Sequence, residues 1–256
     1  MKIFVMERVA YEKQLVSLAQ AFKYEELLEL ASQLVQDYPN WHIAWHYLAV
    51  AYGLKGNHEA AVDNFITSLK HKPTSTKALY GLSVSLHALK QYDKAIACLL
   101  KYRTINKPGF KDSFCLGINF AELGVHADAI KYFTEALEYD NKNEGLLFCL
   151  ADSHRILGQF EDAVKYFEQS LRLNPNNVNV LHNTAVAYFG LNEKPKAIAY
   201  YKKAITCDSE FVRSIRNLAE IYLENGDTWA AKPLILKLRE LVPEADYVKK
   251  MLDMVC

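Results

Sequence analysis

The side chains of this chain that could do chemistry are scattered histidines and cysteines without the neighbours that a catalytic or metal site requires. His58 opens the segment HEAAV, which begins like a zinc-protease helix, but Val62 stands where the second histidine ligand has to be. His42 and His46 are four residues apart and could share a helix face, yet no carboxylate or cysteine is positioned to complete a tetrahedral site. The sequence therefore predicts surface histidines and no metal site.

The cysteines and the nucleotide-binding motifs point the same way. Cys115 and Cys149 are 34 residues apart, but packed helices lie about 8–10 Å from each other, which is beyond the reach of a disulfide. The chain has no GxGxxG, no GxxxxGK[ST], no GxSxG and no CxxC sequence. We therefore predict that the chain is not an enzyme and binds no cofactor.

An internal repeat sets the elements that would position any site. The segment LADSHRILGQFEDAVKYFEQSLRLNP, from Leu150 to Pro175, lies over LAVAYGLKGNHEAAVDNFITSLKHKP when it is shifted back by 102 residues, which is three times 34. The period holds along the whole chain without an insertion. It divides the chain into seven units: 8–41, 42–75, 76–109, 110–143, 144–177, 178–211 and 212–245.

Apolar, small and turn-forming residues recur at fixed positions of each unit. Positions 4, 7, 8 and 11 are mostly apolar, as on one face of a first helix, and positions 20, 24, 27 and 28 repeat the pattern in a second helix. Position 15 is glycine in four units and Asn192 in a fifth, which predicts a left-handed turn between the helices. Position 20 is alanine in six of seven units, where two helices can approach closely. Proline at position 32 ends the second helix in four units.

These residues resemble the tetratricopeptide repeat, a helix pair of 34 residues. The resemblance is carried in the second unit by Trp45, Leu48, Ala49, Tyr52, Ala61, Phe65, Ser68 and Pro73, and in the fourth by Leu116, Gly117, Phe120, Ala129, Phe133 and Ala136. It implies an all-α fold, a right-handed superhelical solenoid of seven helix pairs in one domain over 1–256, closed by a capping helix over 246–256. Phe22 and Lys90 stand where glycine is usual, and Pro233 is expected to kink the last second helix.

Composition argues against two classes of partner. Thirty Lys and Arg residues balance thirty Asp and Glu residues, and no basic run exceeds two residues, so the charge pattern of a nucleic-acid binder is missing. No apolar run approaches the ~20 residues that cross a bilayer, and the opening MKIFVM is too short for a secretory signal. Five cysteines without metal-type spacing, and no glycosylation sequon, favour a reducing compartment. We expect a cytoplasmic protein with neither nucleic-acid binding nor membrane insertion.

The remaining candidate for function is the face of the first helix that points away from its apolar stripe, at positions 2, 5, 6, 9, 12 and 13. In the family that the chain resembles, this set lines a concave groove where partner peptides bind. Position 5 is aromatic or imidazole through the middle units, and position 9 is valine or isoleucine in five units. Contiguous apolar surface of this kind marks a contact site. The predicted partner-binding residues are His46, Tyr47, Val50, Tyr80, Val84, Phe114, Ile118, Phe148, His182, Asn183, Val186, Arg213, Arg216 and Asn217.

The resemblance leaves two kinds of function open. One is a non-enzymatic scaffold or adaptor whose groove holds a peptide or amphipathic helix of a partner protein. The other is an auxiliary arm that presents substrates to an enzyme, or helps to assemble it, with the catalytic part on another chain, similar to the repeat domain of O-GlcNAc transferase. The clamp that binds chaperone tails is incomplete: the best match has Asn183 and Arg213 but Phe148, Asp152 and Asn217 elsewhere, so a chaperone co-factor is not expected.

Two further interpretations concern single parts of the chain. The aromatic residues at position 5 could pack against neighbouring helices instead of facing a ligand. The closing segment DYVKKMLDMVC is more apolar than one covered face requires, and so is the opening MKIFVM. A soluble end cap normally has a polar outer face. We therefore expect one chain end to meet another copy or another subunit.

Overall fold

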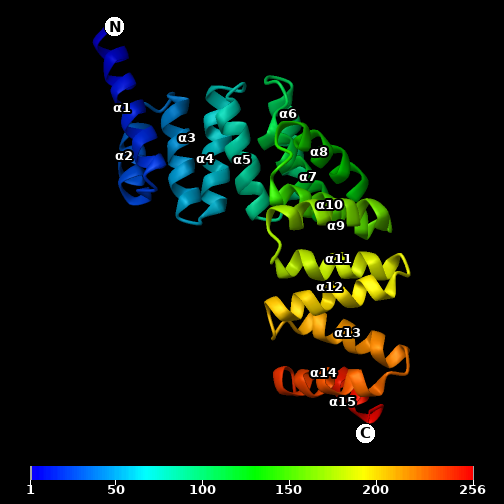
Figure 1. Cartoon of the computed structure of the whole chain (residues 1–256). Coiled ribbons are helices and arrows are strands. Elements are labelled where there is room, and N and C mark those ends of the chain that lie inside the picture. The colour runs from blue at the N-terminus through cyan, green and yellow to red at the C-terminus, as the bar shows by residue number, and fades with distance from the viewer. Residues whose placement is uncertain (1, 256) are drawn as a thin grey trace. The chain divides into compact units, whose positions relative to one another are not determined.

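A computed structural model describes the backbone of residues 2–255 and the side chains of residues 6–255, and over this range it contains fifteen α-helices and no strand (Figure 1). The first helices of the repeats are α1 (Lys2–Gln20), α3 (His42–Leu54), α5 (Thr76–Ala88), α7 (Phe110–Glu122), α9 (Glu144–Ile156), α11 (Val178–Gly190) and α13 (Val212–Glu224). The second helices are α2 (Tyr24–Asp37), α4 (His58–His71), α6 (Tyr92–Arg103), α8 (His126–Tyr139), α10 (Phe160–Leu173), α12 (Lys194–Cys207) and α14 (Thr228–Leu241). The closing helix is α15 (Asp246–Asp253).

The predicted helix pairs and the closing helix are confirmed, and Cys256, the predicted end of that helix, lies outside the described residues. The chain divides into two compact units, which we call the N-terminal unit (Met1–Val125) and the C-terminal unit (His126–Cys256). Within each unit, helices that follow one another along the chain pack together. The single domain over 1–256 stays a prediction, and each unit is described by itself below.

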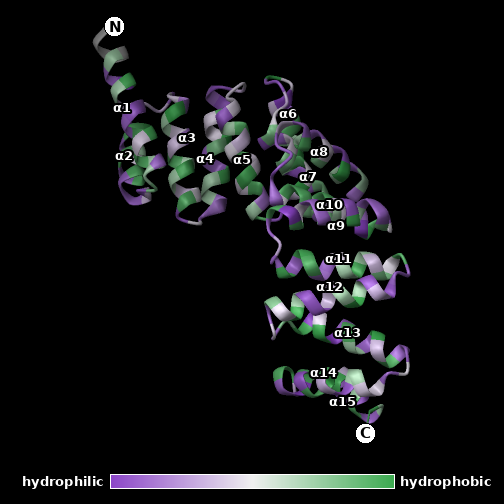
Figure 2. Cartoon of the chain, viewed as in Figure 1, coloured by the Kyte–Doolittle hydropathy of each residue, from purple (hydrophilic) through white to green (hydrophobic). Residues whose placement is uncertain are grey.

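Several helices begin where an asparagine or aspartate side chain accepts a hydrogen bond from the first turn. Asn57 accepts from the backbone N–H of Ala60 at the start of α4, at 3.1 Å, and Asp227 accepts from that of Ala230 at the start of α14, at 3.0 Å. Such caps satisfy backbone donors that have no partner within the helix. Figure 2 shows hydrophobic and hydrophilic residues alternating along the helices, as expected when each helix buries one face.

The small residues of the repeat lie where the two helices of a pair meet. All seven residues at position 20, from Leu27 to Ala231, are 0 % exposed. The first repeat has leucines at positions 8 and 20, Leu15 and Leu27, and both are fully buried. Position 20 is therefore buried in every repeat, including the atypical first one.

The turn between the helices keeps one geometry in all seven repeats, whether or not glycine is present. Position 15 has a positive φ at each of its four glycines, and also at Phe22 (56°), Lys90 (58°) and Asn192 (59°). Side chains other than glycine cost energy in this left-handed region. The packing of the helices on either side therefore imposes the turn on Phe22 and Lys90.

We expect Lys90→Gly to raise the free energy of unfolding by roughly 0.5–1 kcal/mol, because relief of the left-handed backbone exceeds the entropy that glycine adds to the unfolded chain. Chemical denaturation followed by circular dichroism measures the change. Gly124→Ala is the matched control: its new methyl group would meet no atom within 4 Å, but φ is 76°, so the variant should lose stability. A less stable Lys90→Gly variant would contradict this explanation.

Two of the second helices, α6 and α14, differ from the others. Helix α14 is one helix from Thr228 to Leu241 and contains Pro233 in its interior. Helix α6 ends at Arg103, two repeat positions before the other second helices end. The shorter helix brings Arg103 to Asp112 at the start of α7, where the guanidinium Nε lies 3.3 Å from the carboxylate Oδ2.

Candidate partner-binding surface

The residues at position 5 make a recurring contact inside their own repeats. Three of these side chains pack against the large residue at position 24 of the second helix, with ring centroids 5.5 to 5.9 Å apart. The pairs are His46 with Phe65, Phe148 with Phe167, and His182 with Tyr201. The aromatic character of position 5 is therefore explained at least in part by packing within the repeat.

The predicted residues divide into buried side chains and partly exposed side chains. Tyr47 is 7 % exposed and His182 is 6 % exposed, so these two side chains support the groove from inside. Tyr80 is half-buried, and its hydroxyl oxygen lies 3.6 Å from the sulfur of Cys115. Phe114 is half-buried and stacks on Phe110 of the same helix, with centroids 5.5 Å apart.

Position 9 is different, because its residues remain at the surface of the N-terminal unit. The apolar row, as we call it, contains Val16, Val50, Val84 and Ile118, one from each of α1, α3, α5 and α7. Val84 is 46 % exposed, and the other three side chains are partly exposed. Val16 belongs to this row although the predicted site residues did not include it.

A small cavity lies between α5 and α7 along the apolar row. It has a volume of about 150 Å³ and is lined by Ser83, Val84, His87, Cys115, Ile118 and Asn119. Its polar atoms are paired with each other: His87 Nδ1 lies 3.1 Å from Asn119 Oδ1, and Asn119 Nδ2 donates to the Cys115 carbonyl at 2.7 Å. A ligand in this cavity would contact mainly the apolar side chains of Val84 and Ile118.

Four residues of this cavity, Ser83, His87, Cys115 and Asn119, are not among the predicted binding residues, although Cys115 lies at position 6 of the predicted groove face. His87 occupies position 12, which the helical projection had already assigned to the groove face, so the pattern could have identified it. Ser83 and Asn119 lie at positions 8 and 10, which the projection turned toward or beside the helix interface.

A second cavity of the N-terminal unit carries charge. It has a volume of about 220 Å³ and lies among α1, α3 and the start of α5, with Glu12, His42, His46, Lys72 and Lys77 in its lining. Glu12 occupies position 5 of the first repeat. One end of the apolar row therefore has both acidic and basic groups beside it.

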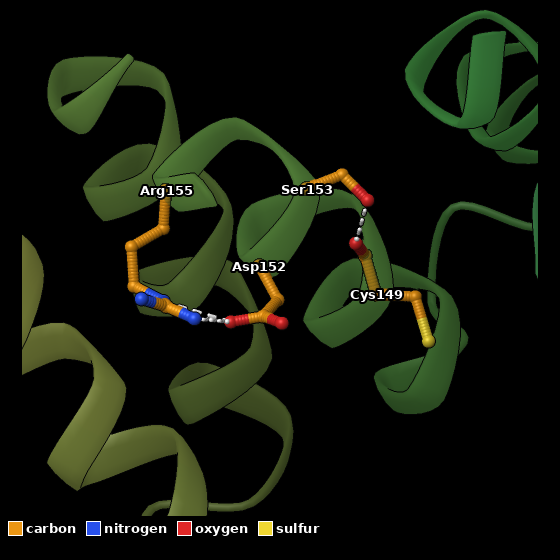
Figure 3. Close-up of polar contacts among 4 residues, drawn as sticks. All are labelled: Cys149, Asp152, Ser153 and Arg155. Carbon is orange, nitrogen blue, oxygen red and sulfur yellow. Dashed lines mark hydrogen bonds and ion pairs between the residues drawn. The ribbon is translucent and has the colours of Figure 1, made fainter. Parts of the chain in front are cut away.

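The C-terminal unit interrupts the position 9 pattern with charged residues. Asp152 takes the place of a valine and is held by Arg155, with the Nη2 and Nε atoms each 2.8 Å from Asp152 Oδ1 (Figure 3). Beside this pair, the hydroxyl of Ser153 donates to the Cys149 carbonyl at 2.9 Å, within α9 (Figure 3). Val186 is the one aliphatic residue at position 9 in this unit.

The basic residues predicted for the groove are engaged within the C-terminal unit. Arg213 donates to Asn179 Oδ1 at 2.7 Å. Arg216 donates to Glu220 at 2.8 Å and lies over the ring of Tyr247, 4.5 Å from its centroid. Asn217 donates to the Tyr201 hydroxyl at 3.0 Å. Asn183 is partly exposed on α11. This face of the C-terminal unit is polar, whereas that of the N-terminal unit is apolar.

Four titratable groups of the predicted groove face, those of His46, Tyr80, Cys115 and His182, are held in their neutral forms. Burial, with Lys77 nearby, lowers the pKa of His46 to about 4, and burial with Arg213 nearby lowers that of His182 to about 4. Burial raises the pKa of Tyr80 and that of the Cys115 thiol. At neutral pH these groups carry no charge, and Cys115 is not a thiolate nucleophile. This part of the groove face is therefore suited to binding apolar groups.

The described residues contain neither a cluster of metal-binding side chains nor a helix suited to crossing a bilayer. No three histidine, cysteine, aspartate or glutamate side chains in that part of the chain lie close enough together to hold a metal ion. None of its helices combines the length and the apolar character needed to cross a membrane.

Comparison with solved structures shows the fold. A tetratricopeptide-repeat protein from Cytophaga hutchinsonii, solved for its C-terminal part, is 18% identical over 94% of this chain and 99% of that one, with a TM-score of 0.79. YrrB, described as a TPR protein with an unusual peptide-binding site, is 16% identical over 73% of this chain and 96% of its own, with a TM-score of 0.68.

A third solved structure is longer than this chain. It comes from the APC/C hetero-tetramer Cut9–Hcn1, is 18% identical over 96% of this chain, and has a TM-score of 0.63. This chain spans 48% of that protein's length.

The sequence itself matches tetratricopeptide-repeat family models in both units. One model matches residues 48–109 and another matches residues 144–210, which together make about half of the chain. No curated protein matches the sequence. With fifteen helices over the described residues and two independent family matches, the chain belongs to the tetratricopeptide-repeat family.

Proposed function

We propose that this chain is a non-enzymatic scaffold whose N-terminal unit binds an apolar-rich peptide or amphipathic helix of a partner protein. The tetratricopeptide-repeat fold is one of protein–protein interaction modules, which are generally not catalytic. The observation that carries the proposal is the cavity between α5 and α7, where Val84 and Ile118 of the apolar row remain open to a ligand side chain. YrrB, a fold relative, has a peptide-binding site.

The chemistry of the surface favours an amphipathic helix as the ligand. Asparagine is absent from positions 6 and 9 throughout the N-terminal unit, so the surface has few amides for gripping an extended peptide backbone. A row of aliphatic side chains with pockets between them suits anchors spaced along one face of a helix. The charged cavity with Glu12 and Lys77 would set the direction of the ligand more than its affinity.

Variants of the apolar row test the proposal. Helical peptides selected from a displayed random library on the full chain should bind Val84→Glu and Ile118→Glu variants about tenfold or more weakly, because each buries a carboxylate against the ligand's apolar face. Isothermal titration calorimetry measures the affinities.

Val186→Glu is the matched control, because it occupies the same repeat position in the C-terminal unit. Circular dichroism of each variant checks that the fold is intact. If the selected peptides bind Val84→Glu as tightly as the unchanged chain and lose affinity for Val186→Glu, the binding surface lies in the C-terminal unit and the proposal fails.

A second candidate function is an assembly subunit of a larger complex, with any catalytic part on another chain. It is favoured by the fold relative found in a hetero-tetramer. Affinity purification separates the two: one stable catalytic partner supports the assembly role, and several non-catalytic clients support the scaffold. The cytoplasmic location and the contacts of the chain ends with another copy both remain predictions.

A further inference from the structure

The outer surface of the last repeat departs from the other six at two positions of α14. Position 21 is aliphatic in the first six repeats and is Lys232 in the seventh; the six are Leu28, Val62, Ile96, Ile130, Val164 and Ile198. Position 18 is acidic, alanine or proline in the first six repeats and is Trp229 in the seventh; the six are Glu25, Glu59, Asp93, Ala127, Glu161 and Pro195. The seventh repeat therefore has its large apolar side chain at position 18, which is exposed, and a lysine at position 21, where the other repeats have an aliphatic residue.

This exchange coincides with a hollow between α12 and α14. Val164 and Ile198, at position 21 of the two preceding repeats, pack against the buried cluster around Tyr201. Where α14 has Lys232 instead, a cavity of about 720 Å³ opens between the two helices, with Ile205, Leu218, Tyr222 and Leu234 in its lining. Trp229 stands at its edge and is 88 % exposed.

The edge of the hollow carries lysines that have no acidic partner among the described residues, in contrast to two lysines at the start of α12. Lys194 and Lys196, at the start of α12, form ion pairs with Glu224 and Glu193. Lys202, Lys203 and Lys232 form no ion pair with any described residue; Lys202 and Lys203 lie over the rings of Tyr222 and Tyr200. Helix α12 contains no acidic residue at all. The surface therefore combines an apolar hollow with unpaired positive charge.

This basic edge continues into a second hollow on the same side of the C-terminal unit. This one has a volume of about 460 Å³ and shares Lys202 and Thr206 with the first. It adds Lys203, and it reaches Pro175 and Asn176 in the loop between α10 and α11. The two hollows adjoin at Lys202 and Thr206 and together form a track whose apolar end is at Trp229.

We propose that this track is a second docking surface, on the side of the second helices, for an acidic peptide segment of a partner protein that carries one large apolar residue. The apolar residue enters the hollow between α12 and α14 beside Trp229. Carboxylates on the same segment pair with Lys202, Lys203 and Lys232. The surface is separate from the apolar row, so the two proposals can fail independently.

Peptide display on the full chain tests this inference. Random twelve-residue peptides selected on the purified protein and then resynthesised should include a class rich in Asp and Glu around one Trp, Phe or Leu. This class should bind Trp229→Glu and the double variant Lys202→Glu/Lys203→Glu about tenfold or more weakly. Its affinity should fall with added salt, because the charges are exposed.

A variant that restores the aliphatic residue of the other repeats at position 21 tests the role of the hollow more directly. Lys232→Ile should fill part of the hollow and weaken binding of the acidic peptides without lowering the unfolding midpoint, which excludes misfolding as the cause. Lys70→Glu, an exposed lysine on α4, is the matched charge control and should bind these peptides normally. Val84→Glu should also leave their binding unchanged.

Three results would overturn the inference. In the first, no selected peptide loses affinity for the Trp229 and Lys202 variants. In the second, light scattering finds a dimer that Trp229→Glu dissociates, so the occupant is a second copy of this chain. In the third, phosphatidylserine vesicles bind the protein through these residues and acidic peptides do not, so the occupant is a membrane.

Discussion

Asp112→Asn is expected to lower the free energy of unfolding by about 3 kcal/mol, because it removes one charge of a buried ion pair. The carboxylate of Asp112 is almost fully buried and lies 3.3 Å from the guanidinium of Arg103. Its other oxygen accepts from the backbone N–H of Gly109 at 2.9 Å. Asparagine can keep the contact with Gly109 through its Oδ1, so the loss reports the contact with Arg103.

Chemical denaturation followed by circular dichroism measures this loss, and hydrogen exchange of the α6 and α7 amides locates it. Asp93→Asn, an exposed aspartate in the first turn of α6, is the control and should change stability by less than about 0.5 kcal/mol. Arg103→Met combined with Asp112→Asn should recover part of the loss, because no charge is then left unpaired. A change in Asp112→Asn no larger than in the control would contradict the assigned role.

The second large effect is a loss of stability in mild acid. His46 and His182 have a pKa of about 4 in the folded chain, below the ~6.5 of an unfolded histidine. Between these values the unfolded state binds more protons, so stability is complete above pH 6.5 and falls as the pH drops toward 4. At pH 5 we expect a loss of about 2 kcal/mol for each histidine.

Unfolding experiments at pH 7 and pH 5 measure this difference. His46→Gln and His182→Gln should each reduce the loss between the two pH values, whatever their stability at pH 7. His71→Gln, an exposed histidine at the end of α4, should leave the loss unchanged. Equal pH dependence in all three variants would mean that neither buried histidine stays neutral at pH 5.

The repeat pattern predicted most of the fold because its signals are local. Alanine at position 20 and glycine at position 15 each determine one feature of every repeat, and the helices begin and end accordingly. At Phe22 and Lys90 the signal is absent, yet the same left-handed turn forms. There the packing of neighbouring helices overrides the local preference of the residue.

The groove could be predicted only in part. A projection of one helix separates faces, but it does not include the next helix, so it assigned Tyr47 and His182 to the surface although both are buried. The position 9 residues of the N-terminal unit are partly exposed, and their role in binding stays a prediction. The hollow beside Trp229 could have been found by comparing positions 18 and 21 across the repeats.

The central claim is that the apolar row of the N-terminal unit is the surface that binds the partner's helix. Methyl NMR of the isotope-labelled chain, titrated with a helical peptide selected on it, tests this most directly. We expect the methyl signals of Val84 and Ile118 to shift in proportion to occupancy while those of Val186 stay in place. Shifts confined to Val186 and the C-terminal unit, with Val84 and Ile118 unmoved at saturation, would contradict the claim.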